Sequence, residues 1–254
     1  MGKIKVGLFG FGRTGRVVAN EFFVNEAFDL RWIIRKTEQT KNQYASRLFG
    51  YEYDASPILS EQVLNRSFFE DHRADVIVDF SNEDGYKKYA EAADLGIPII
   101  SAISVYKEED IDQLKEYAAK TAVLYSPNIT LGVNFLLVAS QLFQKIAPYA
   151  DIQIIEEHFR EKKEISGTAL KIANVLGLGK KHVNSIRAGG IVGKHEIIFG
   201  LQNQTVRLTH ESINKAAFGQ GAIFAAKWLV RQKKGFFSME RIITEMIAEN
   251  LPTY

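Results

Sequence analysis

The chain has 254 residues, of which 46% are hydrophobic, and its formal net charge at pH 7 is only +2. This length and composition suffice for one large or two small globular domains, and the near balance of charge argues against nucleic acid or a membrane surface as the main partner. Cysteine is absent, which excludes disulfide bonds, a thiolate nucleophile and a Cys-ligated metal.

The rest of the chain offers no pattern that points to a metal, a membrane or export. No His, Asp and Glu residues recur at metal-ligand spacing, and no apolar run approaches the roughly 20 residues that a membrane span needs. The first apolar run carries Lys5 and ends in a glycine-rich turn, which is unlike a secretory signal. We therefore expect a cytoplasmic protein without a metal site.

The first half of the chain alternates short apolar runs with amphipathic stretches. The runs predict strands and the stretches between them predict helices. This alternation is typical of βαβ units around a parallel sheet. The predicted strands are Ile4–Phe9, Leu30–Ile34, Ala74–Phe80, Ile97–Ile100 and Ala122–Tyr125, and the predicted helices are Gly15–Val24, Asp84–Leu95 and Glu108–Lys120.

A glycine-rich turn follows the first predicted strand. GxGxxG between a strand and a helix indicates dinucleotide binding. Gly10 permits the tight turn, Gly12 lets the backbone approach a pyrophosphate, and Gly15 lets helix and strand pack closely. The N–H groups at the helix start attract phosphates, and Arg13 and Arg16 add positive charge. The competing interpretation is a strand–helix turn without a ligand. The predicted phosphate-binding residues are Gly10, Phe11, Gly12, Arg13, Thr14, Gly15 and Arg16.

The end of the second predicted strand bears on the choice of nicotinamide cofactor. NAD enzymes usually place a carboxylate there to bind the ribose 2′-OH, whereas this strand continues into Arg35, Lys36 and Thr37. Two cations and a hydroxyl suit a 2′-phosphate, so NADPH is the expected cofactor. NADH stays the alternative, because Glu38 is close enough in sequence to reach a ribose.

The pattern of the chain changes near Asn128, where we place a domain boundary. Apolar–polar alternation beyond it predicts a mostly antiparallel or mixed sheet with one covered face. We expect a Rossmann-type α/β dinucleotide-binding domain of residues 1–127 with 216–254, and an α+β substrate-binding and oligomerisation domain of residues 128–215. The later predicted elements are the helix Val133–Ile146, the strands Asp151–His158, Ser185–Arg187, His195–Leu201 and Gln204–His210, and the helices Ala216–Val230 and Met239–Glu249.

The segment after the strand Asp151–His158 combines groups that suit a small anionic substrate. A charged loop with Lys162 leads into Ser166–Thr168, which opens a helix. Residues at a helix start cap its N–H groups and can bind a carboxylate. Lys162 could hold a second carboxylate or donate a proton, and His158 could act as an acid near neutral pH. The competing interpretation is a capped helix after a solvated loop.

This segment, from Glu156 to Ala169, resembles the signature of the 4-hydroxy-tetrahydrodipicolinate reductase family, which reads roughly E-x-H-H-x-x-K-x-D-A-P-S-G-T-A. Further family-like segments lie in the same order along nearly the whole chain. They are Val78–Ser81, Pro127–Asn134, Arg187–His195, His210–Ser212 and Phe218–Ala222.

The resemblance implies an enzyme that reduces 4-hydroxy-tetrahydrodipicolinate to tetrahydrodipicolinate with NAD(P)H, in diaminopimelate and lysine biosynthesis. It implies an N-terminal cofactor domain and a C-terminal domain that binds the cyclic dicarboxylate and builds a homotetramer through its sheet. Within the second domain it implies that His158 serves catalysis and that Lys162 is the proton donor. The implied carboxylate clamp consists of Ser166, Gly167 and Thr168.

The resemblance also extends the expected cofactor site to the turns after the third, fourth and fifth strands. The residues at these turns are Phe80, Ser81, Ser101, Ala102, Ser104, Pro127 and Asn128.

Several positions depart from the family pattern. Phe159 stands where a second histidine contacts substrate, and the stretch before Ser166 is one residue shorter. Ser101–Ser104 replaces a G-T-T-G turn, Phe9 replaces a glycine, and Lys215 stands where arginine is common. A reductase of the same fold for another cyclic imine or oxo acid, or a non-catalytic NAD(P)-binding protein, therefore remain alternatives.

Two histidines lie in predicted strands outside these motifs. They are expected to serve the sheet or an interface rather than chemistry, since a lone histidine is more often structural than catalytic. They are His195 and His210.

Overall fold

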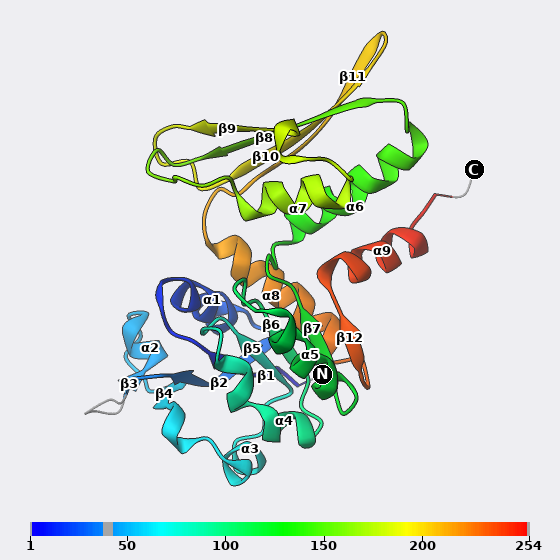
Figure 1. Ribbon diagram of the computed structural model, residues 1–254. Helices are drawn as coiled ribbons and strands as arrows, with labels where there is room; N and C mark the ends of the chain where they lie inside the picture. Colours follow the sequence, from blue (N-terminus) through cyan, green and yellow to red (C-terminus); the bar gives the residue numbers. More distant parts are fainter. Residues whose placement is uncertain (1, 38–42, 253–254) are drawn as a thin grey trace. The chain divides into compact units, whose positions relative to one another are not determined.

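The computed structural model describes residues 2–37 and 43–252, so the prediction for Glu38 lies outside the described residues. The chain forms two compact units (Figure 1). The first comprises the chain up to Ile129 together with Phe218–Met239, and the second comprises Thr130–Ala217 with the chain from Glu240 onward. The boundary at residue 129 lies close to the one expected near Asn128.

The first unit is built on a parallel sheet, as predicted. Within the described residues its strands follow the order β12-β7-β6-β5-β1-β2-β4-β3, and only the β3–β4 pair is antiparallel. The sequence order reverses at β1, the position where open α/β sheets bind ligands. The strands are β1 (Ile4–Phe9), β2 (Phe28–Arg35), β3 (Gln43–Tyr44), β4 (Pro57–Ser60), β5 (Val76–Asp79), β6 (Ile99–Ser101), β7 (Ala122–Tyr125) and β12 (Gly235–Phe237).

Helices connect these strands, and one of them differs from its prediction. The predicted helix Asp84–Leu95 is two pieces, because Tyr89 leaves helical geometry with φ −117° and ψ 20°. The elements are α1 (Arg13–Val24), α2 (Ala45–Leu48), α3 (Arg66–Asp71), α4 (Ala90–Asp94), α5 (Glu108–Ala118), α8 (Ala216–Leu229), which crosses the unit boundary, and the 3₁₀ turns η1 (Glu61–Val63) and η2 (Gly85–Lys88).

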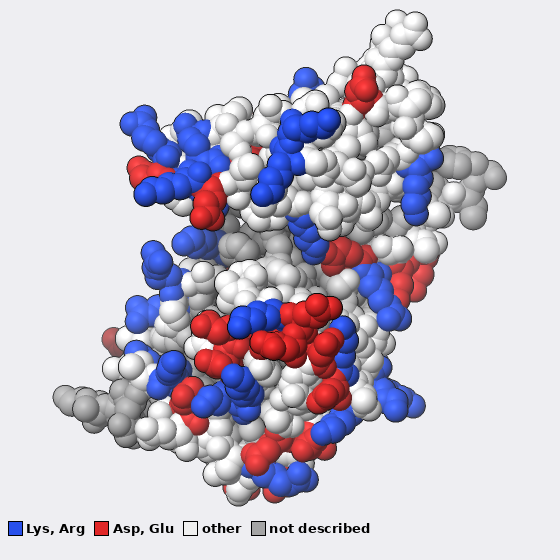
Figure 2. Space-filling model, viewed as in Figure 1, with Lys and Arg blue, Asp and Glu red and all other residues white. Residues whose placement is uncertain are grey.

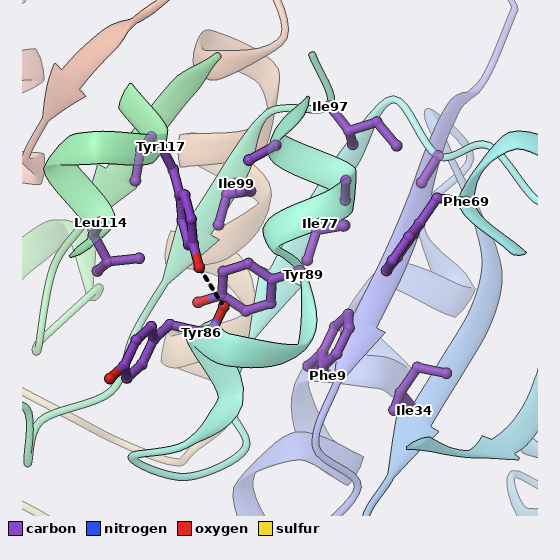
Figure 3. Packing of buried hydrophobic residues seen from close by; sticks show 14 of the residues in the cluster. Phe9, Ile34, Phe69, Ile77, Tyr86, Tyr89, Ile97, Ile99, Leu114 and Tyr117 are labelled. Carbon is purple, nitrogen blue, oxygen red and sulfur yellow. Dashed lines mark hydrogen bonds between the residues drawn. The ribbon is translucent and has the colours of Figure 1, made fainter. Parts of the chain in front are cut away.

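A buried aromatic cluster packs against one face of this sheet (Figure 3). The Phe9 ring at the end of β1 meets Trp32 and Tyr89 edge to face, with ring centroids 5.9 and 5.3 Å away. The Tyr117 hydroxyl donates to the Tyr86 carbonyl at 3.3 Å. Since such rings pack densely and hold their geometry, the carboxyl ends of β1 and β5 are firmly placed.

The second unit holds the smaller sheet, in the order β11-β10-β8-β9. The β8–β9 pair is parallel and the other pairs are antiparallel, which confirms the predicted mixed sheet. Two helices, α6 and α7, cover one face (Figure 1) and enclose an aliphatic core. The elements are α6 (Leu131–Ile146), β8 (Asp151–His158), α7 (Gly167–Val175), η3 (Lys180–His182), β9 (Val183–Arg187), β10 (Lys194–Leu201), β11 (Gln204–Glu211) and α9 (Met239–Glu249).

The last helix is grouped with the second unit, whereas all of residues 216–254 were expected in the first domain. A side-chain ion pair between Lys171 on α7 and Glu240 on α9 accompanies this grouping. Such a contact joins residues far apart in sequence, so helical periodicity alone could not reveal it. In the described part of the chain, no helix is long and apolar enough to cross a membrane.

Candidate active site

A cleft of about 620 Å³ opens in the first unit at the carboxyl ends of β1, β2 and β5. Three turns that are distant in sequence meet there because parallel strands end at the same edge of the sheet. The lining includes seven of the residues predicted to bind cofactor: Gly10, Phe11, Gly12, Arg35, Lys36, Phe80 and Ser81.

The glycine turn has the geometry that its spacing predicts. Gly10 has φ +93°, which favours glycine, and a Cβ there would lie 2.6 Å from the Phe80 carbonyl. A Cβ at Gly15 would lie 2.3 Å from the Gly10 carbonyl oxygen. Both glycines are thus required by the close approach of the backbone itself.

Gly12 differs from these two, because no atom of the described chain lies within 4 Å of the place of a Cβ there. It caps α1 without a side chain, and the first turn of that helix carries no acidic residue. The side chains of Arg13 and Arg16 are exposed beside it. An uncapped helix start with open space and two cations fits a pyrophosphate.

Charged side chains line the cleft beyond β2. Arg35 donates to the Thr37 hydroxyl at 2.9 and 3.1 Å. Lys87 and Lys88, which were not predicted to bind cofactor, also line the cleft from η2. They lie in the segment predicted as a helix after the third strand, and only the sheet order brings that segment beside β2.

The remaining predicted cofactor residues do not line this cleft. Arg13, Thr14, Gly15 and Arg16 lie in the first turn of α1, while the others lie at the end of β6 or in the turns after β6 and β7. Ser101 is fully buried and donates to the Tyr106 hydroxyl at 3.2 Å, so its side chain supports the fold. At β6 and β7 these are Ser101, the last residue of β6, and Ala102, Ser104, Pro127 and Asn128 in the turns that follow.

A buried carboxylate, Asp79, lies directly behind the cleft wall. It accepts the Ser81 backbone N–H at 2.8 Å and the Ser81 hydroxyl at 2.6 Å, and it accepts the Tyr89 hydroxyl at 3.1 Å. Burial raises the pKa of Asp79 to about 6, although these hydrogen bonds oppose the rise. The turn at Ser81 is therefore held by the carboxyl group of Asp79, whose pKa is unusually high.

The second unit brings together the predicted catalytic residues. His158, the last residue of β8, is buried, and Lys162 is half-buried in the loop that follows. Figure 2 shows Lys and Arg side chains gathered over the end of the sheet where this loop lies. In the described chain no carboxylate forms an ion pair with Lys162, which leaves its ammonium available to an anion. Phe159 has 41% of its surface exposed.

A fully buried carboxylate, Glu156, lies beside His158. It accepts from Arg187 at 2.6 and 2.9 Å, from the Ser185 hydroxyl at 2.6 Å, from the Ser166 N–H at 3.3 Å and from the His158 ring at Nδ1. Burial alone would raise the pKa of Glu156, but the hydrogen bonds led by Arg187 outweigh it and lower the pKa to about 2. Glu156 is therefore ionised at neutral pH.

The start of α7 is open to a ligand. Ser166 occupies the N-cap position without a side-chain capping bond, and its hydroxyl instead contacts His195 Nε2 at 2.9 Å. A Cβ at Gly167 would have no neighbour within 4 Å, and Thr168 is half-buried in the first turn. A helix start of this kind attracts a carboxylate.

His195 lies closer to this cluster than the sequence suggested. Its ring centroid is 5.3 Å from that of His158, and burial, reinforced by the charges of His158 and His210, lowers its pKa to about 4. His158 also has a lowered pKa, because burial outweighs its bond to Glu156. Both rings are neutral at pH 7.

Sequence reasoning did not identify the buried partners of these residues. Glu156 and Arg187 stand within the family-like segments, and alternation along β8 places Glu156 on the same face as His158. The sequence signal for this pair was a carboxylate on the covered face of a strand, because a buried carboxylate needs a cationic partner. Among the described residues, no group of three His, Asp or Glu side chains could hold a metal ion.

The chain matches family models along most of its length. A model described as "Dihydrodipicolinate reductase, N-terminus" matches residues 4–129, and one described as "Dihydrodipicolinate reductase, C-terminus" matches residues 131–243.

Individual proteins agree with these matches. A 4-hydroxy-tetrahydrodipicolinate reductase of Caldanaerobacter subterraneus is 32% identical over 67% of this chain and 77% of its own. One from Buchnera aphidicola is 28% identical over 95% of this chain and 98% of its own. In fold, the chain is similar to a dipicolinate-bound dihydrodipicolinate reductase from Paenisporosarcina sp. TG-14, with a TM-score of 0.78 at 20% identity over 94% of this chain and 99% of that one.

Proposed function

The chain belongs to the dihydrodipicolinate reductase family, and from that membership we propose that it reduces 4-hydroxy-tetrahydrodipicolinate to tetrahydrodipicolinate, a step of diaminopimelate and lysine biosynthesis. The reaction takes up a hydride and a proton and releases water. A bound reduced nicotinamide dinucleotide supplies the hydride.

One observation carries the assignment of chemistry to this chain. The loop of Lys162 and the open start of α7 are both tied to Glu156, the first through Arg187 and the second through the Ser166 N–H. A cyclic dicarboxylate needs a cation and N–H donors in a fixed arrangement, and this part of the second unit supplies both.

The roles of the substrate-side residues follow from their chemistry. Ser166, Gly167 and Thr168 hold one substrate carboxylate at the helix start. Lys162 donates a proton as negative charge develops on the ring, and His158 lies nearby. Fixed donors and dipoles that need no reorganisation provide most of the rate enhancement.

The first unit binds the cofactor and the second binds the substrate. The glycine turn and the start of α1 hold the pyrophosphate, while the cations beyond β2 favour NADPH over NADH because they can pair with a 2′-phosphate. Lys87 and Lys88 line the same cleft as Arg35 and Lys36 and join them in this role, while each also pairs with a carboxylate of the lining, Asp84 or Glu61.

For the assembled protein we propose a homotetramer in the cytoplasm. The support for a tetramer is the resemblance to a family that assembles through the sheet of its second domain. In this chain that sheet has the order β11-β10-β8-β9, and its helices cover one face. The face away from α6 and α7 is the surface we assign to assembly.

A coupled assay with enzymatically prepared 4-hydroxy-tetrahydrodipicolinate tests this function. We expect substrate-dependent oxidation of NADPH, slower oxidation of NADH, and competition by dipicolinate, which is a stable planar dianion. No oxidation of either cofactor by folded protein would refute the activity.

Phe159 favours a second candidate, a reductase of the same fold for another cyclic imine or oxo acid. Its exposed apolar ring stands where the family pattern has a histidine that contacts substrate. A phenyl ring has no hydrogen-bond donor, so it cannot make the hydrogen bond that a histidine could donate to the substrate. A substrate without an acceptor group at that position would therefore lose nothing by binding here. Faster turnover of such an imine than of 4-hydroxy-tetrahydrodipicolinate would favour this candidate.

A further inference from the structure

Glu156 connects three parts of the second unit that the proposed function needs. Its carboxylate accepts from the ring of His158, from the backbone at the start of α7 and from Arg187. The side chain of Glu156 is fully buried, so its carboxylate is hydrogen-bonded by protein groups and not by bulk solvent. One carboxylate therefore contacts three segments of the chain that are separate in the sequence.

The contact with His158 determines where the ring carries its proton. An ionised carboxylate can only accept a hydrogen bond, so Nδ1 of His158 must be the donor. Because burial keeps this ring neutral at pH 7, Nε2 then carries a lone pair. The space beside Nε2 is narrow, since a Cβ at Gly193 would lie 3.0 Å from it. Nε2 of His158 can therefore accept a hydrogen bond but cannot donate a proton, so Lys162 is the proton donor of the proposed reaction.

The contact with Arg187 extends the influence of Glu156 to the Lys162 loop. The guanidinium donates to both carboxylate oxygens of Glu156 and, from Nε, to the Lys162 carbonyl at 2.8 Å. It also donates to the carbonyls of Glu164 and Ile186, each at 2.9 Å. All five N–H donors of a guanidinium are used in this way, which the three donors of a lysine could not reproduce.

We propose that Glu156 is the positioning residue of this site: it holds His158 with Nε2 as the acceptor, fixes the N–H at the start of α7 and, through Arg187, places the loop of Lys162. This proposal rests on the proposed function only where it assigns chemistry to His158 and Lys162. The charged and titratable groups facing Glu156 are Arg187 from β9, His158 from its own strand, His195 from β10 and Lys162 from the loop.

The first test needs neither substrate nor a variant of Glu156. The chain has five histidines, so long-range ¹H–¹⁵N spectra at neutral pH can resolve each ring, and the loss of a signal in His158→Asn identifies His158. We expect the proton on Nδ1 and an unprotonated Nε2. A proton on Nε2 of His158 in the wild-type protein overturns the proposal, whatever the activity of the enzyme.

The second test replaces Glu156 by its neutral isostere. In Glu156→Gln, the amide oxygen should remain where three donors converge, namely Arg187, Ser185 and the Ser166 N–H. The amide N–H₂ then takes the place of Oε2, so the bond from Arg187 Nη1 is lost. The N–H₂ faces His158 and donates to Nδ1, so we expect the ring proton to move to Nε2. We also expect kcat to fall at least about tenfold, with NADPH affinity unchanged because the cofactor binds the first unit.

Glu157→Gln is the matched control, because Glu157 lies on the same strand and pairs with Lys194 instead. It should keep both the wild-type tautomer and the wild-type kcat. Wild-type kcat in Glu156→Gln overturns the proposal. If that variant does not fold, Arg187→Lys replaces it: the His158 tautomer should stay on Nδ1, while kcat falls and KM rises as the loop loses its two carbonyl bonds. An unchanged kcat and KM in folded Arg187→Lys would overturn the link to Lys162.

Discussion

At the residue scale, the substrate site depends on side chains whose charge states are set by burial and by their neighbours. Glu156 is ionised because Arg187 and the other donors outweigh the cost of burial, whereas His158 and His195 are neutral because burial prevails. At the proposed substrate site, positive charge therefore comes mainly from Lys162, since Arg187 is paired with Glu156.

Lys162→Ala should lower kcat by about 10² or more, as expected for the loss of a general acid. Steady-state kinetics with 4-hydroxy-tetrahydrodipicolinate checks this. Lys163→Ala, which removes the neighbouring exposed cation, is the control and should stay near wild type. If Lys162→Ala retained nearly full turnover, the role of this loop in catalysis would have to be abandoned.

Arg35→Glu should weaken NADPH binding much more than NADH binding, because it replaces a partner of the 2′-phosphate by a repelling charge. Calorimetric titration with each cofactor measures both affinities. Arg31→Glu makes the same charge change on an exposed part of β2, outside the cleft, and should affect the two cofactors alike. Equal losses of both cofactors in Arg35→Glu would exclude Arg35 from cofactor selection.

At the element scale, the turns after β1 and β5 contribute to the cleft of the first unit in different ways. The glycine turn admits a ligand because one of its glycines faces open space, while the Ser81 turn is held from behind by Asp79. These two features can be tested separately, because one concerns binding and the other concerns stability.

Gly12→Ala should bind NADPH much more weakly while keeping its stability within about 1 kcal/mol, the usual cost of alanine at a helix N-cap. The new methyl group meets no protein atom but occupies the space assigned to the pyrophosphate. Gly15→Ala is the comparison, and it should destabilise the fold because its Cβ would press on the Gly10 carbonyl. Thermal unfolding and cofactor titration distinguish these effects. Wild-type affinity in Gly12→Ala would contradict pyrophosphate binding at this turn.

The raised pKa of Asp79 predicts a specific dependence of stability on pH. Because the folded protein holds this proton up to about pH 6, against 3.8 ordinarily, the contribution of Asp79 to stability falls as pH rises through that window. Asp79→Asn abolishes this pH-dependent decrease in the free energy of unfolding, which amounts to roughly 3 kcal/mol. We expect its Tm, relative to wild type, to increase between about pH 4 and about pH 6.

The control for this measurement is Asp75→Asn, which changes an exposed carboxylate just before β5. It should keep the pH dependence of the wild-type protein. A constant Tm difference between Asp79→Asn and wild type across this range would show that Asp79 titrates normally.

At the scale of the whole molecule, the second sheet is the feature to examine for assembly. Static light scattering should give a mass near four times the 28.6 kDa of one chain. Glu196→Lys reverses a charge on the face of β10 opposite the buried residues, which is the face assigned to assembly, and should therefore shift the protein toward smaller species. A mass of 28.6 kDa for the wild-type protein at assay concentration would refute the oligomer.

Much of the fold could be predicted from the sequence, because it depends on local patterns. Alternating apolar runs and helices predicted the parallel sheet, and apolar–polar alternation predicted the mixed sheet. The short strands β4 and β12 and the break at Tyr89 were missed. Local periodicity does not mark these two strands, which form where a neighbouring strand offers hydrogen-bonding partners.

By itself, the sequence determined the glycine turn, the cations after β2 and the Lys162–Thr168 segment, because each lies within one continuous stretch where spacing limits geometry. Only the tertiary structure decided that Lys87 and Lys88 line the same cleft as the glycine turn, that Ser101 is buried, and that Glu156 binds Arg187 from another strand. The physical reason is that burial and long-range hydrogen bonds arise when strands pair and pack. The charge of a buried group is therefore set by neighbours that no local pattern reveals.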